Sequence, residues 1–184
     1  MDSVFVAGSR ALSKLYAPVK ERLDNIIAKR LTVLVGDANG ADKAVQRYLA
    51  EHNYQNVFVY CMDVCRNNLG DWSIRPHSAD SDVKHDRHYY GIKDRAMAKD
   101  ATCGFMLWDG VSKGTLTNVV NLLHCDKKVV LFSSPKKRFD TLRSLQDLDR
   151  TLKAVGVRDV ATFLAALEDK RPATEPLPFA GMHL

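Results

Sequence analysis

Short apolar segments alternate with amphipathic segments over most of this chain. Five apolar runs have the length of buried strands, at residues 4–8, 31–35, 57–61, 104–108 and 129–132. Four segments between them carry apolar residues at helical spacing, at residues 14–29, 41–52, 86–99 and 115–124. Continuous apolar strands that alternate with such helices are typical of a parallel sheet covered on both faces. The sequence therefore predicts an α/β fold of three layers, αβα.

The order of these segments also predicts how the strands are arranged. Two half-sheets wound outward from the first strand give a mostly parallel five-stranded sheet of order 3-2-1-4-5, as in Rossmann-like folds. We expect this domain to span residues 1–133, with the polar segment 62–86 as a loop insertion. Residues 139–153 and 158–169 have helical spacing. They predict a C-terminal helical extension over residues 134–170, followed by an extended or disordered tail over residues 171–184.

Composition and charge exclude several classes of protein. The chain has 184 residues, of which 46% are hydrophobic and 27% charged, values that exclude disordered and collagen-like chains. No run of apolar residues is long enough to span a membrane, and the first ten residues lack the pattern of a signal peptide, so we expect a cytoplasmic protein. The net charge of +5 is spread along the chain, with one compact basic run at Lys136–Arg138. This distribution argues against a nucleic-acid partner.

The cysteines raise the question of a metal site. Cys61 and Cys65, together with His85 and His88, have spacings that only loosely match zinc sites. We therefore expect reduced thiols, no metal and no bound cofactor.

Three polar turns that contain glycine follow three of the predicted strands. The carboxyl ends of parallel strands meet at one edge of a sheet, so these turns should converge there. Glycine allows a close approach of the backbone, and the N-terminus of the helix that follows suits a phosphate group. One such turn alone is common as a simple cap, but three together favour a ligand site. The residues concerned are Gly8, Ser9 and Arg10, then Gly36, Asp37, Gly40 and Asp42, then Asp109, Gly110, Ser112, Lys113, Gly114 and Thr115.

Motifs of other nucleotide-binding or hydrolytic folds do not occur in the chain. No GxGxxG follows the first strand, and no GxxxxGK[ST] or GxSxG is found. These observations argue against a dinucleotide oxidoreductase, a P-loop NTPase and a hydrolase with a nucleophile elbow.

The segments VFVAGSR, LVGDANGADKAV and IKDRAMAKDATCGFMLWDGVSKGTLTNVVN occur in an order that resembles the SLOG superfamily. The resemblance covers residues 4–132 and is best to the YspA-type small proteins, with the Smf/DprA domain and the LOG phosphoribohydrolases as relatives. It implies a Rossmann-like fold that binds a nucleotide or a nucleotide-derived ligand, such as a nucleoside monophosphate, ADP-ribose or an NAD-like molecule. It also implies that Lys93 and Asp94 belong to the site, and that the protein forms a homodimer.

One departure from the resemblance concerns mechanism. LOG hydrolases carry a glutamate three positions after the threonine of the third turn, where this chain has Asn118. An amide cannot act as a base or stabilise an oxocarbenium-like transition state by its charge. The chain is therefore expected to bind its ligand as a sensor or sequestering protein.

Two alternatives remain open. An enzyme of the N-glycosidic bond, either a phosphoribohydrolase or a relative of the nucleoside deoxyribosyltransferases, would need another carboxylate. Asp109 and Asp42 are the candidates for this catalytic role, with Asp37 a third, although aspartates at such positions often only cap turns and helices. The second alternative is a nucleic-acid accessory role like that of DprA.

Overall fold

The computed structural model describes residues 2–79, 87–157, 160–162 and 165. The first half of the fold consists of β1 (Ser3–Gly8), α1 (Ala17–Ala28), β2 (Thr32–Gly36), α2 (Ala41–Glu51) and β3 (Val57–Met62). The second half consists of β4 (Ser73–His77), α3 (Arg87–Asp100), β5 (Cys103–Trp108), α4 (Lys113–His124), β6 (Lys128–Ser133), β7 (Arg138–Leu142) and α5 (Leu145–Ala154).

The strands form one sheet in the order β4-β3-β2-β1-β5-β6-β7. All neighbouring strands pair in parallel except β6 and β7, which are antiparallel. The predicted order 3-2-1-4-5 is confirmed for the central strands β3, β2, β1, β5 and β6. The prediction of five strands is wrong, because one further strand lies at each edge of the sheet.

The first additional strand, β4, lies in the segment 62–86 that we expected to be a loop. Residues 73–76 of β4 are exposed, so this strand has neither the apolar run nor the alternation by which a strand is recognised. Pro76 fits such an edge strand, because a residue there can lack one ladder hydrogen bond. Residues 80–86 of the same segment lie outside the described residues.

The second additional strand, β7, lies in the extension that we expected to be entirely helical. Residues 134–137 reverse the chain, and Lys137 adopts a φ of 49° in this turn. The predicted helix 139–153 is therefore wrong at its start. Its remainder is α5, which begins with a capping box formed by Ser144 and Asp147. The predicted helix 158–169 lies mostly outside the described residues, and the tail 171–184 lies entirely outside them.

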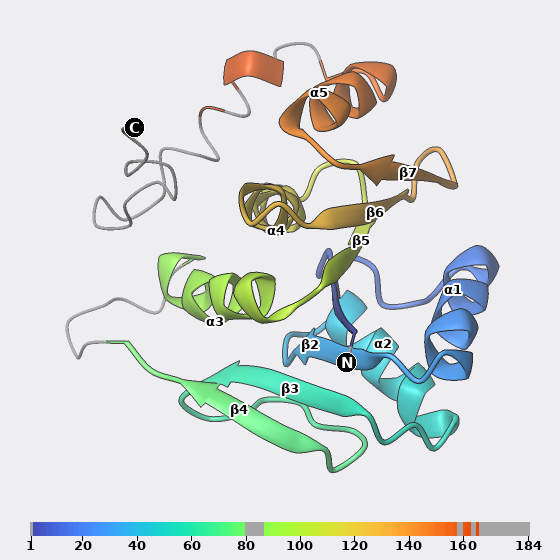
Figure 1. Cartoon of the computed structure of the whole chain (residues 1–184), viewed down its shortest axis with the longest axis vertical. Coiled ribbons are helices and arrows are strands. Elements are labelled where there is room, and N and C mark those ends of the chain that lie inside the picture. Colours follow the sequence, from blue (N-terminus) through green and yellow to red (C-terminus); the bar gives the residue numbers. More distant parts are fainter. Residues whose placement is uncertain (1, 80–86, 158–159, 163–164, 166–184) are drawn as a thin grey trace, which may run out of the picture.

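Helices cover both faces of the sheet, which confirms the three-layer prediction (Figure 1). Alternate residues of β1 belong to different layers of the core. Val4 and Val6 pack in a cluster with α1 and α2, whereas Phe5 and Ala7 pack in a cluster with α3, α4 and α5. This alternation follows from the period of two in a strand. It explains why β1, at the centre of the sheet, is apolar on both faces.

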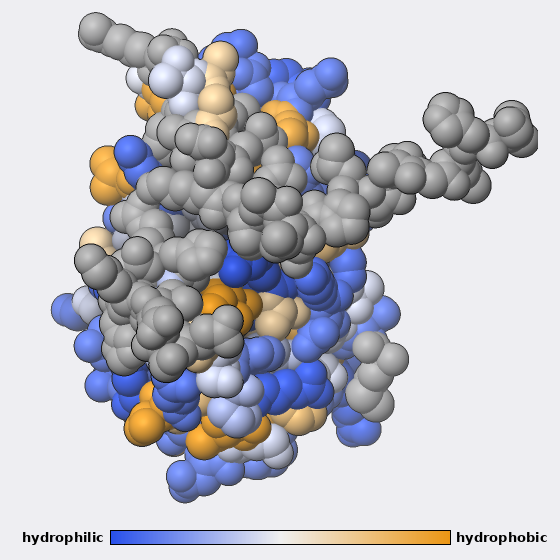
Figure 2. All heavy atoms as spheres, turned by 90° about the vertical axis from the view of Figure 1, so that its left-hand side faces the viewer, coloured by the Kyte–Doolittle hydropathy of each residue, from blue (hydrophilic) through white to orange (hydrophobic). Residues whose placement is uncertain are grey.

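In the part of the chain that the structure describes, no helix is both long and apolar enough to cross a membrane. Figure 2 shows the face that carries α3 and α4. The described residues visible there are mostly hydrophilic, and the hydrophobic ones form small separate groups.

Candidate functional site

A cavity of about 590 Å³ lies at the carboxyl ends of the central strands. This volume is in the range of sites for small molecules. Its wall is built from the segments that follow β1, β2, β3 and β5 and from one side of α3. The lining residues are Ala7, Gly8, Ser9, Arg10, Ala11, Ala38, Asp42, Arg66, Tyr90, Lys93, Asp94, Asp109, Ser112, Gly114, Thr115 and Asn118.

The structure brings most of the residues singled out in the sequence to this cavity. Gly8, Ser9, Arg10, Asp42, Lys93, Asp94, Asp109, Ser112, Gly114, Thr115 and Asn118 line it. The remaining residues, Gly36, Asp37, Gly40, Gly110 and Lys113, are not among its lining residues.

The loop after β5 is organised by the carboxylate of Asp109. Its Oδ1 accepts hydrogen bonds from the backbone N–H groups of Val111 (3.1 Å) and Ser112 (2.8 Å), and its Oδ2 accepts one from the Ser9 hydroxyl (2.6 Å). Burial acts to raise the pKa of Asp109, but these hydrogen bonds outweigh it and hold the pKa below its usual value. Asp109 is thus an ionised group that fixes the loop.

Ser112 completes the start of α4. Its hydroxyl oxygen accepts hydrogen bonds from the Thr115 backbone N–H (3.4 Å) and from the Thr115 hydroxyl (3.1 Å). The first N–H groups of a helix have no partner inside it, and the dipole places partial positive charge there. Gly114 lies in this first turn and lines the cavity, so the start of α4 can accept an anion.

Arg10 is an exposed cation at the cavity. The described residues place no carboxylate within ion-pair distance of its guanidinium group, whose central carbon lies 5.6 Å from the centre of the Tyr90 ring. The backbone beside Arg10 is fixed, because the Ser9 carbonyl accepts a hydrogen bond from the Ala41 N–H (3.1 Å). The turn after β1 therefore holds a free cationic group next to an aromatic ring.

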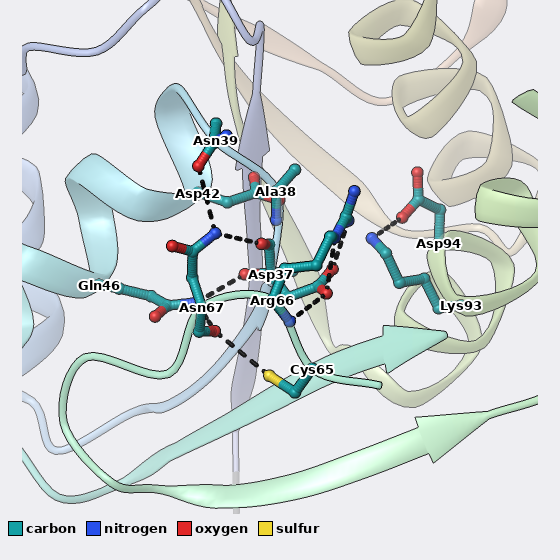
Figure 3. Close-up of polar contacts among 11 residues, drawn as sticks. Asp37, Ala38, Asn39, Asp42, Gln46, Cys65, Arg66, Asn67, Lys93 and Asp94 are labelled. Atoms are coloured by element: carbon teal, nitrogen blue, oxygen red, sulfur yellow. Dashed lines mark hydrogen bonds and ion pairs between the residues drawn. The ribbon is translucent and has the colours of Figure 1, made fainter. Parts of the chain in front are cut away.

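Asp37 lies below the cavity and holds a second arginine. The Arg66 guanidinium donates to both carboxylate oxygens of Asp37, at 2.9 and 2.6 Å, and the Arg66 N–H donates to Oδ2 at 3.1 Å (Figure 3). Asp37 is fully buried. Burial acts to raise its pKa, but the bonds from Arg66 hold the pKa below its usual value. Asp37 is not among the residues that line the cavity, and its carboxylate positions Arg66, which does line it.

Three further charged residues, Asp42 on α2 and Lys93 and Asp94 on α3, also line the cavity, and Asp42 lies next to Ala38 (Figure 3). The Lys93 ammonium donates to Asp94 Oδ1 at 2.7 Å, and both Asp42 and Lys93 are more than nine-tenths buried. Burial raises the pKa of Asp42 to about 6, against the opposite effect of the Lys93 ammonium. Burial would lower the pKa of Lys93, but Asp94 and Asp42 raise it, so Lys93 stays protonated.

Two glycines of the second turn have structural reasons to be glycine. Gly40 has a φ of 86°, and a Cβ there would lie 2.3 Å from the carbonyl oxygen of Arg10. A Cβ on Gly36 would lie 2.4 Å from Asp42 Oδ2 and 3.0 Å from Lys93 Nζ. Gly40 thus allows the first two turns to meet, and Gly36 leaves room for the buried charges.

Sequence reasoning missed Arg66 and Tyr90 as cavity residues. Arg66 lies in the polar segment after the third predicted strand, and Tyr90 is one of two adjacent tyrosines in the predicted helix 86–99. Of these two tyrosines, Tyr89 is buried and its hydroxyl donates to Asp63, whereas Tyr90 lines the cavity. Arg66 could have been predicted from its position after a strand, because the segments that follow parallel strands lie at the same edge of the sheet as the glycine turns. The alanines that line the cavity, Ala7, Ala11 and Ala38, carried no signal.

The described residues contain no cluster of metal-ligating side chains. Cys61 is buried in β3, and the Cys65 thiol donates to the Asn67 carbonyl (3.3 Å). Burial raises the pKa of the Cys61 thiol to about 11. His85 lies outside the described residues, as does the side chain of His88, so the zinc alternative is not tested by the geometry.

No protein-family model matches the chain, and no curated protein is significantly similar to it.

Proposed function

We propose that the cavity binds a nucleotide or nucleotide-derived ligand, and that the protein acts as a sensor or sequestering protein of the SLOG type. The observation that carries the proposal is the position of two anion-binding features on one cavity. These are the first turn of α4 and the free guanidinium group of Arg10.

The charges of the cavity favour one phosphate over a polyanion. Three cationic side chains line it, but Arg66 is paired with Asp37 and Lys93 with Asp94. Arg10 is left as the cation without an ion-pair partner among the described residues. Asp42 and Asp94 would repel a second phosphate on their side of the cavity. A small ligand with one phosphate end and one neutral polar end fits this distribution.

A thermal-shift panel of AMP, ADP-ribose, NAD and cyclic nucleotides tests the proposal. A ligand that binds the native state at a hundredfold excess over Kd stabilises it by about 2.7 kcal/mol. We expect at least one compound to raise the melting temperature in this way. No response from any member of the panel, with folded protein, would contradict the proposal.

Two matched variants locate the bound ligand. Arg10→Ala should weaken binding at least tenfold, because a free cation is lost beside the phosphate. Arg47→Ala is the control, since Arg47 is an exposed arginine of α2 that does not line this cavity. Equal binding by the two variants would place the ligand elsewhere.

Cleavage of an N-glycosidic bond is a second candidate function, and one observation favours it. Asp42 lines the cavity, and its pKa is raised to about 6. A carboxylate with such a pKa can take up and release a proton near neutral pH, as a catalytic acid or base must. Asp109, the other catalytic candidate, accepts two hydrogen bonds from its own loop and one from the Ser9 hydroxyl. Chromatography of nucleotides incubated with the protein should then show free base, and Asp42→Asn should abolish it. Unchanged nucleotides would exclude this candidate while leaving the binding proposal intact.

A further inference from the structure

Two buried polar side chains that line the cavity have hydrogen-bonding capacity left over. Asp42 Oδ2 accepts one long hydrogen bond, from the Ala38 N–H at 3.3 Å, and Asp42 Oδ1 accepts none from the described residues. The Asn118 carboxamide, which is 6% exposed, has no hydrogen-bond partner among these residues. Their unpaired atoms are not among the fully buried side-chain atoms that lack a partner, so they are accessible from the cavity, where a bound molecule or water can be their partner.

The other carboxylates near the cavity are either held by several hydrogen bonds or more exposed than Asp42. Asp37 is held by Arg66 in a two-pronged ion pair, and Asp109 accepts three hydrogen bonds. Asp94 accepts from Lys93 at 2.7 Å and is more exposed than Asp42. Asp42 is therefore the buried carboxylate with an oxygen available to a ligand.

The position of the Asp42 carboxylate is fixed by its surroundings. It lies against the backbone of Gly36, where a Cβ would be only 2.4 Å from Oδ2, and the Lys93 ammonium packs at the same place. Figure 3 shows Lys93 and Asp94 on the side of this group that α3 provides. A fixed, desolvated acceptor discriminates strongly between a ligand that offers a donor and one that does not.

The chemistry of this corner selects the kind of donor. An anionic group is repelled by Asp42 and Asp94, and a second cation is repelled by Lys93. What remains is a neutral donor, either an O–H or an amide-like N–H. In a ligand whose phosphate lies at the start of α4, the sugar hydroxyls and the base amino group are such donors.

We propose that Asp42 accepts hydrogen bonds from the vicinal hydroxyl groups of the ligand's sugar, so that the cavity selects a ribose over a deoxyribose. This inference rests on the proposed function. It adds a selectivity that phosphate binding alone would not produce, because Arg10 and α4 do not distinguish the two sugars.

Titration calorimetry on the full chain tests the inference. AMP, GMP, CMP and UMP are each compared with their 2′-deoxy counterparts, and AMP is also compared with 3′-deoxy-AMP and with IMP. We expect any nucleotide that binds to lose at least tenfold in affinity when a hydroxyl is removed, as for a hydrogen bond to a charged group. Equal affinity for ribose and deoxyribose forms would overturn the inference and leave the proposed function standing. Loss of affinity for IMP alone would overturn it too, since Asp42 would then contact the base.

Variants separate the role of Asp42 from a general effect on the fold. In Asp42→Asn the preference for ribose should fall to threefold or less, while Asp149→Asn, a substitution on α5, should keep the wild-type preference. Because the comparison of ribose and deoxyribose is made on wild-type protein first, it holds even if the Asp42 variant is unstable. Failure of every nucleotide to bind wild-type protein would contradict the proposed function itself, and the inference with it.

Discussion

The β2–α2 turn (residues 37–40) and the β5–α4 loop (residues 109–112) border the same cavity but are held in different ways. In the β5–α4 loop, Asp109 bonds to N–H groups two and three residues later, and Ser112 caps the helix that follows. In the β2–α2 turn, Asp37 bonds to Arg66, which is 29 residues away in the chain. The β5–α4 loop makes most of these bonds within itself and one with Ser9 after β1, whereas the β2–α2 turn depends on the segment after β3.

The comparison shows which part of the site depends on the rest of the fold. The β5–α4 loop needs only local sequence to form its cap. The β2–α2 turn needs close contact with the turn after β1 and with the segment 63–72. Gln46, fully buried in α2, strengthens this dependence by donating to the carbonyls of Gly36 (2.8 Å) and Asn67 (3.1 Å). Substitutions in the β2–α2 turn should therefore cost more stability.

The largest effect is expected from Gly40→Ala. Gly40 has a φ of 86°, and the new Cβ would overlap the backbone of Arg10. Strain at such a backbone angle and overpacking each cost about 1–3 kcal/mol, so we expect a loss of roughly 4 kcal/mol in the free energy of unfolding. Urea denaturation measures it. A loss below about 1 kcal/mol would show that the two turns can separate.

The second largest effect depends on pH and comes from Asp42→Asn. The pKa of Asp42 is raised from 3.8 to about 6 in the folded chain, so the native state holds this proton more tightly than the unfolded state. The ionisation of Asp42 therefore destabilises the fold progressively as pH rises from about 4 to 6. At 1.36 kcal/mol per pKa unit, this ionisation lowers the free energy of unfolding by about 3 kcal/mol at pH values well above 6.

Asparagine does not ionise, so Asp42→Asn should gain stability relative to wild type as pH increases. Urea denaturation of both proteins at pH 4 and pH 8 measures the change in their difference. The pKa of Asp42 is also affected by the charges of Lys93, Asp94 and Asp37. Both proteins contain these three residues, so the two proteins still differ only at position 42. The same difference at the two pH values would refute the prediction.

A smaller loss is expected from Arg66→Ala, which leaves the buried carboxylate of Asp37 without its side-chain partner. Because Arg66 is itself partly exposed, we expect a cost of about 2 kcal/mol, less than for a fully buried pair. Arg138→Ala is the control, since the pair of Arg138 and Asp140 lies at the surface and should contribute under about 1 kcal/mol. Equal effects of the two substitutions on urea denaturation would mean that Asp37 finds another partner.

The same contrast explains what the sequence could and could not predict. Continuous apolar runs predicted the five central strands. The prediction that the polar turns after β1, β2 and β5 lie at one edge of the sheet was also correct. The strand β4 was missed because Ser73–Pro76 is exposed at the sheet edge and shows no apolar pattern. The pair of Asp37 and Arg66 was missed because no local pattern links residues so far apart. Capping by Asp109 and Ser112, in contrast, depends on neighbours within three residues.

The smallest effect on stability is expected from Gly114→Ala in the first turn of α4, although its effect on binding should be as large as that of Arg10→Ala. A Cβ on Gly114 meets no atom within 4 Å, so the fold accommodates it, and alanine favours a helix over glycine by about 1 kcal/mol. The new methyl group would instead project beside the cavity that Gly114 lines, where the proposed phosphate approaches the helix backbone. We expect unchanged or slightly raised stability without ligand, and at least a tenfold loss in nucleotide affinity by titration calorimetry. Wild-type affinity in this variant would show that the phosphate does not bind at the start of α4, and Arg10 would then be its principal contact.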